Sequence, residues 1–478
     1  MKTLAKTSIV YGTGAILTKA FGFFLIPLYT RYFTVEEYGI LALLNIMLQL
    51  VTFVFLLGIS SAAMRFYFDP DADDVFRKQL YGNAMLLLLI FPAILLLSVG
   101  PLAYLLVDRF LPSVPFFPYV FIILILGLFV PMKRLTIGLL RVQKRAKAYV
   151  AYTFSFFLIQ TIVIIIAVAG LGYGLKGQIY AQLLANIIFW IVAVVILRKN
   201  ARISFSWSMS KSLLVFGIPL IPFFVFAWVN TASGRFMLEK YASLREVGLF
   251  ALAVQFGGLI TLLGGAFDKA FVPYFYETAQ KSNGPEILGR FATKYLALFG
   301  LIALFTLIVA RPMVLIMADP KFHEAIDYIP LLLFANWLML LYRLFQWSLM
   351  HSKRTGVLSA LTATYAVLMV SLLFLFLKQW QMGMKGVIYA MIIVAAVRIV
   401  AGFVISMRYF KIRFKVNDLG LVALALSVSA LFINFIPVEK SIILGTFIKL
   451  IIFSLIAVVI VKWAKIESIK QLIPIKGR

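Results

Sequence analysis

The chain has 478 residues, of which 63% are hydrophobic and 13% charged, and its formal net charge is +27. A soluble chain is only about 45–50% apolar and about 25% charged. The composition therefore excludes a series of soluble domains and predicts an all-α polytopic membrane protein. The chain has no cysteine and two histidines, His323 and His351, far apart in the sequence. We expect neither thiol chemistry nor a histidine-bound metal, and no cofactor.

Apolar runs of about 20 residues predict about 14 membrane-spanning helices. Six lie near 8–29, 39–58, 84–107, 120–140, 149–170 and 179–197. Six more follow a polar linker, near 213–232, 247–267, 295–318, 329–349, 358–377 and 387–407. The last two lie near 419–436 and 442–461. No cleavage pattern follows the first span, so we expect it to remain in the protein.

An internal repeat relates the two halves of the chain. Residues 31–43 recur as 240–252, 143–145 as 352–354 and 174–181 as 383–390, all at an offset of about 209 residues. The offset maps the first six spans onto the next six. Because six is even, the halves should be parallel repeats about an axis along the membrane normal. We expect a lobe at 1–205, a lobe at 206–414, and two further helices with a basic cytoplasmic tail at 415–478.

The distribution of basic residues predicts the orientation. With the N-terminus in the cytoplasm, one side collects roughly 31 Lys and Arg residues and the other roughly 11. We therefore expect a multi-pass protein of the cytoplasmic membrane with both termini inside. The basic loops account for the high net charge, so no nucleic-acid partner is expected. The cytoplasmic set includes residues at the end of the fourth span: Lys133, Arg134, Arg141, Lys144, Arg145 and Lys147.

Several basic residues fall inside predicted spans and are candidate substrate-binding residues. Lys19 lies about 16 Å into the first span at 1.5 Å per residue, and Arg343 and Arg398 lie inside the tenth and twelfth. Ionisable residues at such depth usually mark a pathway or site. The alternative for each is packing or anchoring at the interface. Three arginines nearer span ends are candidates for a cavity mouth or for anchors: Arg31, Arg65 and Arg235.

Acidic residues, unlike the basic ones, do not fall inside the predicted spans. All of them, Glu239 and Asp268 included, are expected in loops or at span ends. A cation-coupled exporter of cationic drugs usually needs a buried carboxylate. Deep cations without deep anions favour an anionic substrate instead.

Helix-breaking residues cluster in the first and seventh spans. Proline removes a backbone hydrogen bond and bends a helix, and paired breakers in corresponding helices are candidate gating elements. Close packing of small residues is the alternative. The candidates are Gly22, Pro27, Pro219 and Pro222.

Three segments carry a resemblance to a known family: 24–39, 246–250 and 271–277. The chain resembles the polysaccharide (Wzx-like) flippases of the multidrug/oligosaccharidyl-lipid/polysaccharide exporter superfamily along nearly its whole length. Members often carry an Asp-Arg pair at the end of the seventh span. Here Arg235 matches but Gly234 replaces the acid.

The resemblance implies a transporter rather than an enzyme. It implies translocation of a polyprenyl-pyrophosphate-linked oligosaccharide for cell-surface polysaccharide biosynthesis, by alternating access of two lobes. The deep cations would hold the pyrophosphate, and the last two spans would help form a groove for the lipid tail. The implied partners are the lipid-linked oligosaccharide and the bilayer, with a coupling ion, H⁺ or Na⁺, left unassigned. Alternatives are a lipid II flippase, a cation-coupled multidrug antiporter and a membrane glycosyltransferase or polymerase.

Overall fold

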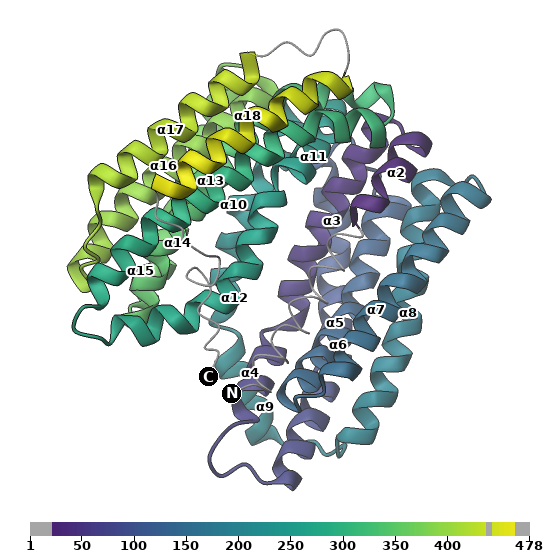
Figure 1. The fold of residues 1–478 in the computed structure, drawn as a ribbon. Coiled ribbons are helices and arrows are strands. Elements are labelled where there is room, and N and C mark those ends of the chain that lie inside the picture. The colour runs from purple at the N-terminus through teal and green to yellow at the C-terminus, as the bar shows by residue number, and fades with distance from the viewer. Residues whose placement is uncertain (1–21, 436–441, 464–478) are drawn as a thin grey trace. The chain divides into compact units, whose positions relative to one another are not determined.

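The computed structural model describes residues 22–435 and 442–463, and every regular element in those ranges is a helix (Figure 1). In that part of the chain 11 helices are long and apolar enough to cross a membrane, or up to 12 if the bent pair Leu244–Gly257 and Leu259–Asp268 is one span. The expected all-α polytopic architecture is confirmed. The predicted first span lies mostly outside the described residues, and the thirteenth contains a shorter apolar helix, Asn417–Ala430.

The chain divides into two compact units. The first comprises Met1–Gly248 and Leu373–Gly383. Its helices are α2 (Ile26–Tyr32), α3 (Val35–Leu56), α4 (Ile59–Phe66), α5 (Asp74–Phe110), η1 (Phe116–Val120), α6 (Phe121–Val142), α7 (Ala146–Ile165), η2 (Ile166–Gly170), α8 (Gly174–Asn200), α9 (Trp207–Gly217), α10 (Leu220–Tyr241) and η4 (Phe374–Gln379).

The second unit comprises Leu249–Leu372 and Met384–Arg478, and α11 (Leu244–Gly257) begins at the end of the first. Its other helices are α12 (Leu259–Ala279), α13 (Gly284–Met317), η3 (Pro320–Tyr328), α14 (Ile329–His351), α15 (Thr355–Leu373), α16 (Gly383–Tyr409), α17 (Val416–Phe435) and α18 (Ile442–Trp463). The lobe boundaries that the repeat predicts remain a prediction.

The first repeated segment starts a helix in each copy. Thr34 Oγ1 accepts a hydrogen bond from the Glu37 backbone N at 3.1 Å, and Glu37 Oε2 accepts one from the Thr34 N at 2.9 Å. This reciprocal capping box supplies partners for backbone N–H groups that the first helical turn leaves unpaired. In the second copy the Glu246 N donates to Ser243 Oγ at 3.2 Å. The repeated sequence therefore encodes the start of α3 and of α11.

The third repeated segment, 174–181 and 383–390, lies against the first in each copy. Gly174 and Gly383 open α8 and α16 with positive φ angles of 52° and 55°. A Cβ on Gly174 would lie 3.9 Å from Glu37 Oε1, and one on Gly383 would lie 2.5 Å from Glu246 Oε2. In each copy a carboxylate thus stands at a helix N-terminus, where negative charge is stabilising. Glycine is required at Gly383 both for the backbone angle and for this close approach.

The two copies of the first segment also pack against each other. A methyl group on Gly39 of α3 would overlap the carbonyl oxygen of Leu244, and one on Gly248 of α11 would overlap the carbonyl oxygen of Val35. Gly39 and Gly248 occupy the same position in the repeat, as do Val35 and Leu244. The contact between α3 and α11 is therefore reciprocal, and it depends on the absence of side chains.

Aromatic rings hold α12 to α13 and α14 in the second unit. Phe271 stacks on Phe291 with ring centroids 3.8 Å apart, and it lies 5.0 Å from the ring of Trp347. Phe275 contacts Trp347 as well. These contacts explain why α12 continues to Ala279, well beyond the predicted end of the span at residue 267.

Candidate functional site

Arg343 forms an ion pair with an acidic residue inside the second unit. Its Nη1 donates to Oδ2 of Asp268, with side chains 23% and 25% exposed respectively. Asp268 is expected in a loop or at a span end, and the apolar part of the bent pair α11–α12 ends at this residue. It sits inside α12, because packing of Phe271 and Phe275 extends that helix. The other carboxylate oxygen, Oδ1, is buried without a hydrogen-bond partner among the described residues.

Arg398 lies between aromatic rings on α16, also in the second unit. It is 9% exposed, and its guanidinium carbon lies 4.9 Å from the ring centre of Tyr365 on α15 and 5.9 Å from that of Tyr342 on α14. Tyr342 and Tyr365 meet edge to face at 5.9 Å. A cation over ring faces is stabilised by the quadrupole of the rings. Arg398 is therefore held inside a three-helix packing.

Lys133 is a deep cation that sequence reasoning missed. The distribution of basic residues predicts Lys133 in the cytoplasmic set, yet it lies in the interior of α6. Its Nζ donates to Asn186 Oδ1 on α8 at 2.9 Å and lies 3.4 Å from the ring centre of Phe156 on α7. The predicted fourth span, 120–140, already contained it. Its depth along that span, at 1.5 Å per residue, is the sequence signal that marks it as a deep cation.

The remaining candidate arginines are less enclosed. Arg31 is exposed in the last turn of α2. Arg65 on α4 is 58% exposed and pairs with Asp69 at 2.5 Å. Arg235 on α10 is half-buried, and its Nη1 lies 3.5 Å from the carbonyl oxygen of Thr231. Lys19 lies outside the described residues, so its role stays a prediction.

The candidate gating residues lie at interruptions of the helical backbone. Gly22 belongs to a helical turn that ends before Leu25, and Pro27 stands in the first turn of α2. Pro219 caps the N-terminus of α10 two residues after α9 ends at Gly217, and Pro222 lies in the first turn of α10. Proline is tolerated in a first turn because the N–H that it lacks has no helical partner there. Their role in gating remains a prediction.

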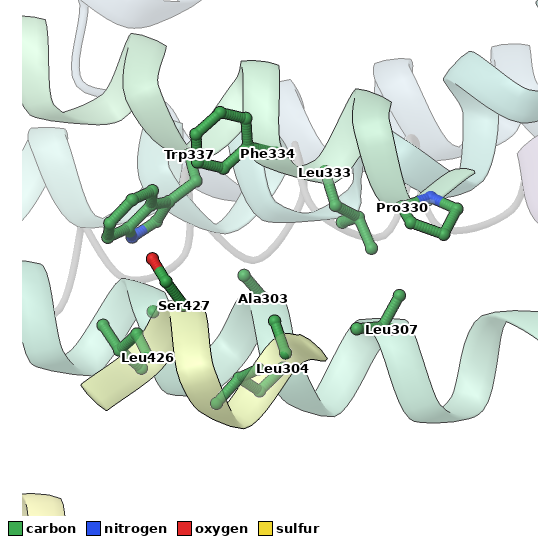
Figure 2. Close-up of a pocket in the computed structure, with 11 residues that line it drawn as sticks. Ala303, Leu304, Leu307, Pro330, Leu333, Phe334, Trp337, Leu426 and Ser427 are labelled. Carbon is green, nitrogen blue, oxygen red and sulfur yellow. The ribbon is translucent and has the colours of Figure 1, made fainter. Parts of the chain in front are cut away.

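An apolar cavity of about 80 Å³ lies among α13, α14 and α17 in the second unit (Figure 2). Trp337, Phe334 and Leu333 of α14 face α13 and α17 across it. The α13 and α17 walls carry small and aliphatic side chains, with a serine as the polar exception: Gly300, Ala303, Leu304, Leu307, Leu426, Ser427 and Ala430. Helix α17 belongs to the C-terminal part of the chain that is not duplicated. The repeat therefore predicts no equivalent of this cavity in the first half of the chain.

Comparison with known proteins gives a family match and a distant relative. The family model described as polysaccharide biosynthesis protein matches residues 4–279. Lsg locus putative protein 1 of Haemophilus influenzae is 24% identical over 287 residues, which are 58% of this chain and 67% of the relative.

Solved structures share the fold. Lipid II flippase MurJ in an inward closed conformation aligns with a TM-score of 0.73 at 15% identity, over 95% of this chain and 98% of that one. An inward-facing multidrug resistance MATE family transporter of the MOP superfamily aligns with a TM-score of 0.63 at 15% identity. The alignment covers 83% of this chain and 95% of that one. A MOP superfamily transporter from Pyrococcus furiosus, reported to have a binding pocket of reverse polarity, aligns with a TM-score of 0.60 at 14% identity. The alignment covers 84% of this chain and 96% of that one.

Proposed function

Because the chain belongs to the polysaccharide biosynthesis protein family, we propose that it is a flippase that moves a polyprenyl-pyrophosphate-linked oligosaccharide across the cytoplasmic membrane. It works by alternating access, not as an enzyme, and both of its termini are cytoplasmic. The oligosaccharide then serves cell-surface polysaccharide biosynthesis. The fold shared with solved transporters supports the transport mechanism.

The observation that carries the proposal is the set of cations inside the spanning helices. Arg343, Arg398 and Lys133 lie within α14, α16 and α6 respectively. A charged side chain in the middle of a spanning helix costs about 2.5–3.5 kcal/mol on insertion scales. A pyrophosphate is an anion that must cross the same region, and fixed cations there lower the cost of its passage. An uncharged or cationic substrate would gain nothing from them.

The ion pair of Arg343 gives a route to anion exchange. Asp268 neutralises Arg343 when no substrate is present. Guanidinium groups bind phosphoryl oxygens through paired, charge-assisted hydrogen bonds. The pyrophosphate displaces the carboxylate, and Asp268 takes the guanidinium back when the substrate leaves. Lys19, Arg31, Arg65, Arg235 and Arg398 remain further candidate contacts for the same anion.

The apolar cavity of α13, α14 and α17 suits the lipid tail. Its lining is aliphatic and aromatic except for Ser427. An isoprenoid chain gains free energy wherever it covers such surface. We assign this cavity to part of the polyprenyl tail while the headgroup moves.

A lipid II flippase is the second candidate, favoured by the alignment with MurJ over 95% of this chain. Both substrates carry a polyprenyl pyrophosphate, so the glycan distinguishes them. The deciding experiment reconstitutes the purified protein in vesicles and follows exposure of each fluorescent glycolipid on the opposite leaflet. Faster movement of the polysaccharide repeat unit than of lipid II is expected. Movement of lipid II alone would select the second candidate, and movement of neither would reject both.

A further inference from the structure

Three helices of the first repeat meet around one cation. Lys133 of α6 lies over the ring of Phe156 on α7, at 3.4 Å from its centre. Phe156 in turn meets Phe189 of α8 edge to face, with ring centroids 5.1 Å apart. The three residues form a triad of one cation and two rings, one from each helix. We call Lys133, Phe156 and Phe189 the first triad.

The second repeat holds the same arrangement at the same three positions. The repeat offset takes Lys133, Phe156 and Phe189 to Tyr342, Tyr365 and Arg398. These residues, the second triad, also comprise one cation and two rings. Arg398 lies over Tyr365 at 4.9 Å, and Tyr365 meets Tyr342 at 5.9 Å. The cation stands on the first helix of the first triad and on the third helix of the second, so at the three triad positions the repeat places no basic residue opposite another.

We infer that Lys133 is a further binding residue for the phosphoryl anion of the lipid-linked substrate and the counterpart of Arg398 in the first repeat. This inference rests on the proposed function. Each repeat then contributes one cation from an equivalent three-helix junction, and the position within the triad that carries the charge is interchangeable.

The surroundings of Lys133 leave its charge available to an anion. Within the described residues, its hydrogen bond is to the Asn186 amide and its ring contact is with Phe156, and both groups are uncharged. An ammonium has three N–H donors, and Asn186 accepts one of them. Gln182, one helical turn from Asn186 and 7% exposed, has its Oε1 buried without a hydrogen-bond partner in the described part of the chain. A charge that no acid neutralises acts at longer range in a medium of low dielectric constant.

The test measures lipid binding by the purified full-length protein in detergent. The probes are a long-chain polyprenyl pyrophosphate and the uncharged polyprenol of the same length. Lys133→Met should weaken binding of the pyrophosphate about tenfold, the effect of one unit charge at moderate distance, and leave polyprenol binding unchanged. Lys133→Arg should bind both like the wild type. Lys147→Met is the matched control, because it removes the same charge from an exposed position on α7.

Three results would overturn the inference. Lys133→Met could bind the pyrophosphate as tightly as the wild type, or it could lose both lipids equally, which indicates a structural role. The third result is that Lys147→Met weakens pyrophosphate binding as much as Lys133→Met does, which would show that binding depends only on the net charge of the protein. If Lys133→Met does not fold, Lys133→Gln, which keeps a donor for Asn186, takes its place. A wild type without preference for the pyrophosphate would reject the proposed function itself, and the inference with it.

A charge relocation tests the equivalence of the triads directly. Lys133→Tyr should lose the preference for pyrophosphate, and adding Phe189→Arg should restore it, since the double variant gives the first triad the pattern of the second. Recovery supports a requirement for one cation within the triad. A folded double variant without recovery would show that the position of Lys133 matters and that the triads are not equivalent.

Discussion

Arg343 and Asp268 pair within the second unit, one residue from α14 and the other from α12. Removing Arg343 alone leaves a partly buried carboxylate without its counter-charge. We expect Arg343→Gln to lower the free energy of unfolding by about 1–3 kcal/mol, less than for a fully buried pair because both groups are about a quarter exposed. Arg343→Gln with Asp268→Asn should recover most of that loss but should not restore transport.

Thermal unfolding in detergent, combined as a double-mutant cycle, measures this coupling. The control pair is Arg413 with Glu286, joined at 2.6 Å but 73% and 51% exposed. Such surface pairs contribute about 0–1 kcal/mol. Equal coupling energies for the two pairs would argue against a special role for Asp268 and Arg343.

Alanine at Gly39 or Gly248 should separate α3 from α11. The added methyl group meets backbone carbonyl oxygens, which cannot move aside as a flexible side chain can. Overpacking of this kind costs about 1–3 kcal/mol, so both variants should melt at lower temperature and transport more slowly. Gly420→Ala on α17 is the control, since nothing lies within 4 Å of its Cβ position. A stable Gly39→Ala protein would contradict the close contact.

A larger side chain in the apolar cavity should discriminate among lipid chain lengths. Ala303→Phe fills space lined by Leu304 and Trp337. We expect slower transport of long polyprenyl substrates and little change for short-chain analogues. Val367→Phe, at a 65% exposed position on α15, provides the matched control. Equal slowing for all chain lengths would assign the cavity a structural role.

Loss of the deep cations should reduce export of surface polysaccharide. Lys19→Ala, Arg343→Ala and Arg398→Ala are each expected to lower it at equal protein level, because Arg343 and Arg398 lie in spanning helices and Lys19 is expected in one. Lys147→Ala should export normally. If all three variants export like the wild type, a cationic pathway for the substrate is excluded.

The aromatic support of Arg398 can be separated from its charge. Tyr365→Phe keeps a ring face and should retain stability, whereas Tyr365→Leu removes a cation–π contact of about 0.5–2 kcal/mol. Comparing melting temperatures of the two variants measures the contribution of the ring. Equal losses would instead assign the effect to the hydroxyl group.

Much of the architecture was predictable because the spans are long and apolar. The repeat was visible as well, and the resemblance to polysaccharide flippases is confirmed by the family match over residues 4–279. Asp268 lies at the end of the apolar span, as expected, but its ion pair with Arg343 was not predicted, because hydropathy gives no sign that α12 continues past the span through the packing of Phe271. Lys133 was not predicted as a deep cation because the basic residues that follow it group it with the cytoplasmic end of the fourth span. The triads escaped alignment because their cations lie on different helices.

The contact of Gly39 and Gly248 has a further consequence. Gly39 meets the Leu244 carbonyl while Gly248 meets that of Val35, so each copy presents the same patch to the other. That is the geometry of an isologous interface, which ordinarily joins two identical subunits about a two-fold axis. The isolated half of the chain is therefore expected to pair with a second copy of itself through this patch, at a concentration-dependent affinity. Within one chain the same association is intramolecular and independent of protein concentration.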